Sequence, residues 1–335
     1  MSNVVLSRLE RSYMALESSF GVVPSFGNTN NVRFIKQDLR NMIETLIRRD
    51  KTGTRTQTVG IRGKSHATWN WNGSLAPSGT AGTAPDFEPL MQCIFGQAPT
   101  VSGGTRTYNF VDLPILTMSL ASYRRPSTVN QRIAAGCVVN EVTFQIGENI
   151  AEFTASGEAR FLIESDYFAD ADTEEAGGLV SFPTEPSAPT TNGGIIAGFT
   201  GSATVAGYSA GAIQLRKATI KVAPGNETIK DQFGFYLPTV TAGNWRVVTV
   251  TADLYENDDA SQQALRVAAI TKAPINMTFV LGTVAGSIVT FELTNVQLGT
   301  DFTDDSGLLF AMQIPESRAF GTSTTSLNEL VMTLT

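Results

Sequence analysis

The feature that most constrains this 335-residue chain is an order of segments that occurs twice. Phe34–Gly53 is echoed by Thr219–Gly234, and His66–Pro77 is echoed by Arg246–Asp258. Three more segments follow in the same order, namely Asp86–Gly96, Pro114–Arg125 and Phe153–Leu162, with the counterparts Ser261–Ile270, Pro274–Val284 and Phe310–Gly321. The offset drifts from 220 − 35 = 185 to 274 − 114 = 160. A repeated order with drifting spacing is typical of two diverged copies of one domain.

The residue pattern favours strands joined by turns. Charged residues make up only 16% of the chain, and Thr, Ser, Val and Gly are abundant. His66–Leu75 alternates so that Ala67, Trp69 and Trp71 share one face, as in a half-buried strand. Val138–Gly147 and Ile150–Ile163 are expected to form a hairpin, and Leu327–Thr335 a terminal strand. We expect a mainly β fold.

A short helix is predicted once in each copy. Phe87–Phe95 is apolar, with Asp86 in position to cap it and Gly96 in position to end it. The counterpart is Ser261–Ile270. Between elements, Arg48–Lys64 and Gly96–Thr107 are expected to be long loops.

The length suits two domains of about 150 residues each. We predict a first domain over 1–163, a linker over 164–194 and a second domain over 195–335. The linker is acidic and then rich in Pro and Thr, so it buries too little apolar area to form a core of its own. Each domain is predicted to be a tandem copy of one antiparallel β-sandwich or barrel with one short α-helix.

Targeting signals and cysteine frameworks are not expected. No stretch approaches the roughly 20 apolar residues that cross a bilayer, and the charged N-terminus argues against a secretory signal. Cys93 and Cys137 are the only cysteines and are predicted to be buried thiols of a protein made in a reducing cytoplasm.

Residues that carry chemistry are sparse. His66 is the only histidine, so a zinc site with recognisable spacing is not expected. Gly60–Ser65 ends like a phosphate-binding loop, but Thr58 stands where that motif requires glycine. Asp170–Glu175 lacks the glycine and final glutamate of a calcium loop. We therefore predict no enzyme activity, no cofactor and no metal.

A basic cluster stands out between the first strands. It comprises Arg48, Arg49, Lys51, Arg55, Arg62 and Lys64. Such a cluster can neutralise phosphates, but Asp50 interrupts it and no aromatic residues alternate with it for base stacking. The alternative interpretation is a contact between subunits or between rings of subunits.

Charge is unequal between the halves. Residues 1–160 hold 16 Lys and Arg against 12 Asp and Glu, and residues 161–335 hold 8 against 19, which gives +4 and −11 and the net charge of −7. Ordinary surface variation is one explanation. The other is that unlike faces meet when subunits join head to tail.

Three segments together resemble the tail tube (major tail) proteins of long-tailed, siphovirus-like bacteriophages. They are Ala15–Phe26, with its strand, Glu, small residues, aromatic, Gly and Pro; His66–Gly96, a strand followed by a short helix; and Ala135–Leu162, a Gly-Cys-Val-Val-Asn strand, a turn and a second strand. The resemblance covers most of residues 10–165 and, more loosely, the second half.

The resemblance implies a β-sandwich whose sheets help to build a barrel around a pore. Subunits then form rings, and rings stack into the virion's hollow tail tube, through which double-stranded DNA passes transiently. The chain is expected to assemble with itself in the bacterial host's cytoplasm and to contact the tape-measure, tail terminator and distal tail proteins, without membrane insertion. Family rings commonly hold six tube domains, so a chain with two favours a trimer over a hexamer, with basic and acidic domains alternating. An acidic lumen would let DNA slide. The alternatives are a single-ring tail component (neck, terminator or distal tail) and a β-sandwich adhesin.

Overall fold

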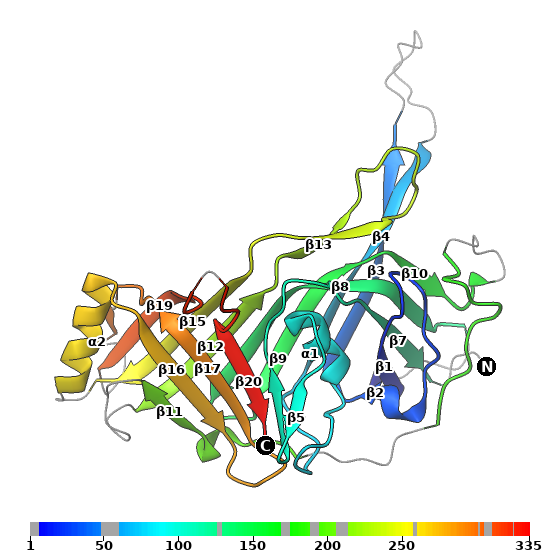
Figure 1. The fold of residues 1–335 in the computed structure, drawn as a ribbon. Coiled ribbons are helices and arrows are strands. Elements are labelled where there is room, and N and C mark those ends of the chain that lie inside the picture. Colours follow the sequence, from blue (N-terminus) through cyan, green and yellow to red (C-terminus); the bar gives the residue numbers. More distant parts are fainter. Residues whose placement is uncertain are drawn as a thin grey trace.

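The computed structural model describes residues 7–47, 60–125, 129–168, 175–187, 194–205, 214–256, 260–300, 302–304, 310–323 and 325–335. Within these residues the fold is built mainly of strands, which pair antiparallel in two large sheets and one small hairpin (Figure 1). The expectation of a mainly β fold is therefore confirmed.

The larger sheet has 12 strands. Its strands are β1 (Glu10–Leu16), β2 (Asn31–Val32), β3 (Lys36–Leu46), β4 (Ile61–Ser74), β7 (Met118–Arg124), β8 (Arg132–Gly147), β9 (Glu152–Ala159), β10 (Phe161–Glu164), β12 (Leu215–Ala223), β15 (Val247–Tyr255), β18 (Phe302–Asp304) and β19 (Ala311–Ala319). The predicted hairpin around Gly147–Asn149 is present as β8 and β9. β8 is long enough to pair with β7 and β10 near its start and with β9 and β12 near its end.

The second sheet has six strands, in the order β11-β16-β17-β20-β6-β5. They are β5 (Thr100–Ser102), β6 (Thr105–Tyr108), β11 (Ser202–Val205), β16 (Ile275–Leu281), β17 (Val289–Val296) and β20 (Leu330–Leu334). β13 (Asn226–Ile229) and β14 (Val240–Gly243) form the small hairpin. The helices are α1 (Glu88–Phe95) and α2 (Ala260–Thr271), with short 3-10 turns at Ser7–Leu9, Asn28–Asn30 and Gly198–Thr200.

Strand pairing repeats in the order in which the sequence repeats. In the first half β3 pairs with β4, β4 with β9, and β9 with the end of β8; in the second half β12 pairs with β15, β15 with β19, and β19 with β18. β7 likewise pairs with β1 and β8, as β16 pairs with β11 and β17. The pairing of β8 with β10 corresponds to the pairing of β17 with β20. β17 and β18 together therefore stand where the first half has the single strand β8.

The two halves share both sheets and one core. β8 pairs with β12 in the larger sheet, and β6 pairs with β20 in the second. One cluster of buried side chains includes residues from both halves, and the rings of Phe144 and Phe291 lie 4.9 Å apart within it. The division into domains 1–163 and 195–335 stays a prediction.

Alternation of side chains explains how the strands pack. Along β4 the predicted face of Ala67, Trp69 and Trp71 is buried. β9 alternates in the same way, because directly opposed residues on paired strands share a face. Trp71 contacts Phe153 on β9, with ring centroids 4.9 Å apart. Leu330, Met332 and Leu334 on β20 are buried as their spacing predicts.

The predicted helix at Phe87–Phe95 is present as α1, and its stop signal is correct. Gly96 adopts the left-handed conformation with φ of 81°, which glycine tolerates. The predicted cap is wrong, because the residue preceding the helix is Phe87 and it makes no side-chain cap. Asp86 instead accepts a hydrogen bond of 2.7 Å from Arg33 Nε. The second predicted helix is present as α2.

Two predicted loops are corrected. Gly96–Thr107 contains β5 and most of β6, which form a tight hairpin. Of Arg48–Lys64, residues 61–64 belong to β4, while 48–59 lie outside the described residues. β3 and β4 extend as a two-stranded arm beyond the sheet (Figure 1). Much of the arm's outer part is exposed, so alternation did not reveal it.

Described parts of the predicted linker 164–194 pack against the first half. Leu179 and Phe182 contact a smaller core cluster that includes Tyr13 and Tyr123. Glu185 accepts hydrogen bonds from Arg11 and Arg125. Among the residues that the structure describes, no helix is long and apolar enough to cross a membrane.

Candidate self-assembly surface

The cysteines and the histidine lie apart from any cluster of ligands. Within the described residues, no group of three or more His, Cys, Asp and Glu side chains is placed to hold a metal ion. Cys93 and Cys137 are buried as predicted, and burial raises the pKa of both thiols well above the usual value. His66 is half-buried on β4, and burial followed by the charge of Lys230 lowers its pKa.

A half-buried carboxylate that the sequence reasoning missed, that of Glu17, holds the start of the chain to the sheet. Glu17 accepts hydrogen bonds from the Ser119 hydroxyl (2.5 Å) and from the backbone N–H of Gly136 (2.6 Å). The Thr117 hydroxyl and the Gly21 N–H donate to its other oxygen. Burial raises the pKa of Glu17, against the effect of these donors. The presence of a charged residue, Glu17, inside the Ala15–Phe26 motif was the sequence signal that could have indicated this role.

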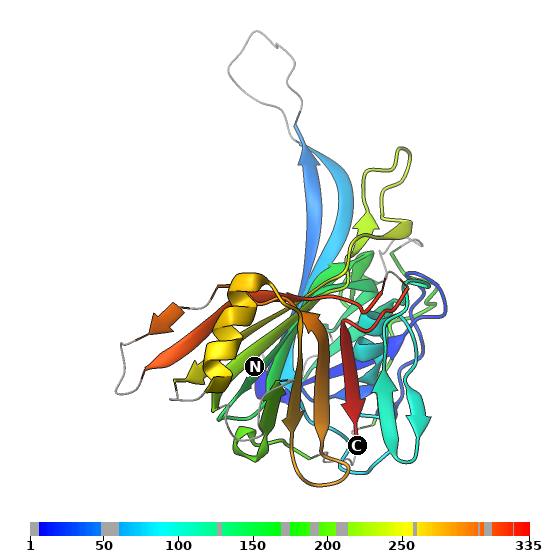
Figure 2. The same ribbon diagram turned by 60° about the vertical axis from the view of Figure 1, so that its left-hand side comes forward.

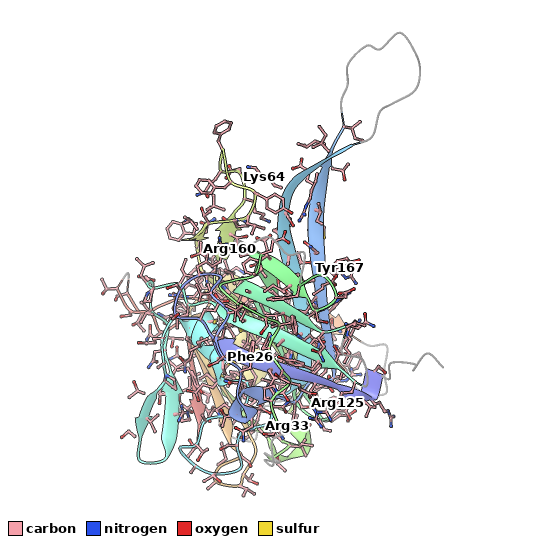
Figure 3. All side chains as sticks on the ribbon, turned by 90° about the vertical axis from the view of Figure 1, so that its right-hand side faces the viewer. Phe26, Arg33, Lys64, Arg125, Arg160 and Tyr167 are labelled. Carbon is pink, nitrogen blue, oxygen red and sulfur yellow. The ribbon has the colours of Figure 1, made fainter. Side chains whose placement is uncertain are left out.

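The predicted basic cluster divides into two parts. Arg48, Arg49, Lys51 and Arg55 lie outside the described residues. Arg62 and Lys64 lie on β4, in the outer part of the arm, and both are engaged within the chain. Lys64 Nζ donates to the carbonyl oxygens of Lys230 (3.0 Å) and Gln232 (2.8 Å), and it lies between the arm and the loop that joins β13 to β14 (Figure 3).

Arg62 holds the other side of the same loop. Its guanidinium donates to Glu175 at 2.7 Å and lies over the ring of Tyr236, 4.6 Å from the centroid. The Tyr236 hydroxyl donates to the same Glu175 carboxylate. These two basic residues therefore brace the β13–β14 loop against the arm, and the structure does not bring them to an open phosphate-binding surface.

One face of the larger sheet is polar across both halves. The register places the following residues on that face, opposite the buried one: Asp38, Arg40, Thr68, Asn70, Thr154, Ser156, Glu141, Thr143, Lys217, Thr219, Lys221, Thr249, Thr251 and Asp253. Thr, Ser and Asn fill much of it. The alternation of these polar residues with core residues was the sequence signal for such a face. That alternation did not indicate which strands are neighbours in the sheet.

Three ion pairs lie on this polar face. Lys217 contacts Asp253 at 3.1 Å, Lys221 contacts Glu141 at 2.8 Å, and Arg40 contacts Asp38 at 2.5 Å. The hydrogen bond with Glu141 raises the pKa of Lys221, and the hydrogen bond from Arg40 lowers that of Asp38. Both groups thus stay charged at neutral pH, and their fields largely cancel.

The junction between the halves joins unlike strands. β8, the last strand of the set β3-β4-β9-β8, pairs with β12, the first strand of the set β12-β15-β19-β18. Four antiparallel pairings separate β3 from β12 (β3 with β4, β4 with β9, β9 with β8, and β8 with β12), so these two strands are parallel. The two sets of strands therefore run in the same direction. The Glu141–Lys221 ion pair crosses this junction. The two sets of strands are thus related head to tail.

The outer strands of this eight-strand path are β3 and β18. Among the described residues β3 pairs only with β4, and β18 only with β19. Arg132 donates to the carbonyl oxygen of Leu39 on β3 at 3.2 Å. Figure 2 shows the orange-red strands β18 and β19 at one side of the molecule, away from the blue arm. Strand edges of this kind are templates for pairing with another chain.

Neither a protein-family model nor a curated protein matches this sequence.

Proposed function

We propose that the chain is a self-assembling structural protein that forms rings, and that these rings stack into the hollow tail tube of a long-tailed bacteriophage. The observation that carries the proposal is the junction inside the chain, where β8 of one repeat pairs with β12 of the next. β18 and β3 are the counterparts of β8 and β12 by pairing order, so β18 of one copy would meet β3 of another in the same way. A head-to-tail contact closes into a ring or continues as a filament.

Three chains per ring are favoured over six because each chain carries the repeat twice. Three eight-strand paths contribute about 24 strands to one barrel. At a strand spacing of ~4.8 Å and a tilt of about 40°, such a barrel has a circumference of roughly 150 Å and a backbone diameter of about 48 Å. Two chains give only about 32 Å on the same estimate, which side chains narrow further. Three is thus the smallest number of chains whose barrel has a lumen wider than a DNA duplex.

The polar face of the larger sheet would line the lumen. Its short hydroxyl and amide side chains lie between neutralised ion pairs. A surface with few unpaired cations offers phosphates little to bind, so DNA would slide past it. This proposal replaces a strongly acidic lumen with a charge-paired one. Placing the polar face inwards also leaves α1 and the second sheet on the outer side.

The remaining features follow the same proposal. The chain would act as part of the virion tail, assembled in the bacterial cytoplasm, with the tape-measure protein inside the tube and terminator and distal tail proteins at its ends. We propose no catalytic role, no cofactor and no insertion into membranes.

The first test is electron microscopy of the purified protein. We expect tubes of uniform width, and three chains in each ring with pseudo-sixfold symmetry. Six chains per ring would contradict the trimer, and a single ring that never stacks would favour a neck, terminator or distal tail component. A soluble monomer that binds glycans would favour an adhesin.

The second test addresses the edge of β3. Neighbouring residues of an antiparallel strand direct their N–H groups to opposite sides, so Arg40→Pro and Asn41→Pro remove different donors. One variant should disturb the pairing with β4, and the other should stay folded by circular dichroism and fail to form rings. Rings that form unchanged from both variants would exclude the β3 edge as the contact.

A further inference from the structure

An aromatic tip projects from the loop between β13 and β14. The side chain of Phe233 is fully exposed and that of Phe235 is 54% exposed. Large apolar side chains gathered at an exposed tip mark an interaction site when they are held in place. The hairpin rises on the same side of the molecule as the β3–β4 arm (Figures 1 and 2).

The hairpin that carries this tip is fixed at several points. Lys64 binds two of its carbonyl oxygens, and the Ser65 N–H donates to Tyr236 O at 3.1 Å. Near its base, the Thr228 hydroxyl (2.6 Å) and the Lys230 ammonium both donate to Glu158 on β9. A contact made by a tip that is already ordered costs little conformational entropy.

A pocket of about 440 Å³ opens at the opposite end of the same strands. Its apolar lining comprises Ile146 on β8, Ala203 on β11, Leu215 on β12, Tyr255 on β15 and Leu281 on β16. Arg216 and Glu148 supply polar groups to its lining. The pocket is large enough for a phenyl ring, which is the kind of group that such apolar lining favours.

The pocket and the tip lie at opposite ends of one chain. β12 begins at the pocket and ends where the β13–β14 hairpin starts, and β15 runs back from the hairpin to the pocket. The tip therefore cannot fill the pocket of its own chain. An apolar projection that fits a pocket elsewhere on the same molecule makes a head-to-tail contact that does not close.

We propose that the Phe233 tip of one copy inserts into this pocket of a second copy in the next ring, and that this contact stacks the rings. The inference rests on the proposed ring and identifies the partner surface along the tube axis. Asp231 beside the tip and Arg216 at the pocket are both exposed and of opposite sign, so these two residues can pair, whereas the exposed Glu148 of the pocket has the same sign as Asp231. β3–β18 pairing would build each ring, and the aromatic contact would join one ring to another.

Two variants that remove opposite halves of the contact test it. Phe233→Ser deletes the tip, and Ser202→Trp places a bulky group at the exposed pocket residue Ser202. Each should form rings but no tubes. Preformed rings of the two variants, once mixed, should give pairs of rings and nothing longer, because only one tip–pocket contact remains intact. Tubes from either variant alone, or a mixture without ring pairs, would overturn the proposal.

Matched controls separate this effect from a general loss of surface apolar area. Trp245→Ser removes another exposed aromatic residue, and Thr204→Trp adds the same bulk two residues along β11. Both should form tubes like the unchanged protein. If Ser202→Trp does not fold, Arg216→Asp and Asp231→Arg replace it: each alone should shorten the tubes, and the double variant should restore their length. Double-variant tubes no longer than those of the single variants would count against the contact.

A cross-link distinguishes failure of this contact from failure of the ring. The double variant Phe233→Cys and Ser202→Cys places one thiol at the tip and one at the pocket, while the native thiols stay buried. Oxidation should therefore join copies through these new cysteines into a ladder of covalent multimers. If the unchanged protein formed no rings, the proposed function would fail, yet such a ladder would still support the tip–pocket contact. Monomers alone after oxidation would overturn it.

Discussion

At the scale of single residues, the packing beneath Trp69 leaves no room for a side chain at position 157. Its indole N–H donates to the carbonyl oxygens of Val138 (3.2 Å) and Glu158 (3.1 Å), so it joins β4 to β8 and β9. A Cβ on Gly157 would lie 1.9 Å from Val138 O and 2.9 Å from the indole ring. Gly157→Ala should therefore lower the free energy of unfolding by about 3 kcal/mol, through overpacking. Urea unfolding followed by tryptophan fluorescence measures this loss.

Gly27→Ala is the control for that substitution. The nearest atom to a Cβ there is 3.6 Å away, an ordinary contact. Its effect should stay within about 0.5 kcal/mol. Equal losses from the two variants would show that the space beneath Trp69 is not the constraint.

A second residue-scale prediction concerns pH. Burial alone would raise the pKa of Glu158, but the hydrogen bonds from Lys230 and Thr228 bring it below the ordinary value. A carboxyl with a lowered folded-state pKa stabilises the fold above its unfolded-state pKa, and this stabilisation is lost as pH falls through the folded-state pKa. Acidification below about pH 4.5 should thus release the β13–β14 hairpin from β9.

Amide hydrogen exchange of residues 226–243 measures that release. Glu158→Gln, which cannot ionise, should show faster exchange at neutral pH and a weaker dependence on acid. Exchange that is identical in the two proteins at every pH would contradict this role of Glu158.

Sequence reasoning found some of these residues and not others. Trp69 and Trp71 were predicted to share one face because a period of two is visible within one strand. The need for glycine at 157 could not be predicted, because it arises from an indole 88 positions away in sequence (157 − 69). Asp86 matched a cap by position, yet the Arg33 guanidinium binds it instead.

At the scale of elements, Lys64 couples the arm to the β13–β14 hairpin. Lys64→Met keeps the length of the side chain and removes the three donors of the ammonium group. The carbonyl oxygens of Lys230 and Gln232 then lose their partner, so amides in residues 229–236 should exchange several-fold faster. Mass spectrometry of exchanged peptides measures this change.

Lys36→Met is the matched control, because Lys36 is an exposed lysine on the neighbouring strand β3. Its exchange pattern over residues 229–236 should equal that of the unchanged protein. Faster exchange in both variants would attribute the effect to lost charge alone.

Elements whose two faces differ were the predictable ones. α2, β4 and β20 each bury one face, and this leaves a period in the sequence. α1 is buried on most sides and was predicted from its apolar run and from Gly96. The outer part of the arm is mostly exposed on both faces, so Arg62 and Lys64 were interpreted as part of a loop. Their partners lie more than 100 residues away in sequence, beyond the reach of local pattern.

At the scale of the whole molecule, the order of elements was predictable and their neighbours were not. The echo between segments foretold that β3, β4, α1, β7 and β9 have counterparts in β12, β15, α2, β16 and β19. It gave no indication that β8 would pair with β12 or β6 with β20. These pairings are made by backbone hydrogen bonds, which do not depend on which side chains the paired residues have. These two pairings join the two halves of the chain into shared sheets.

This sharing predicts what happens when the chain is cut between its halves. A protease site inserted within residues 188–193 leaves β8–β12, β6–β20 and the Phe144–Phe291 contact intact. The fragments should therefore remain one complex through gel filtration, because separating them exposes core side chains at roughly 25 cal/mol for each Å². Separate elution of two folded fragments would instead establish that the halves are independent domains joined by a linker.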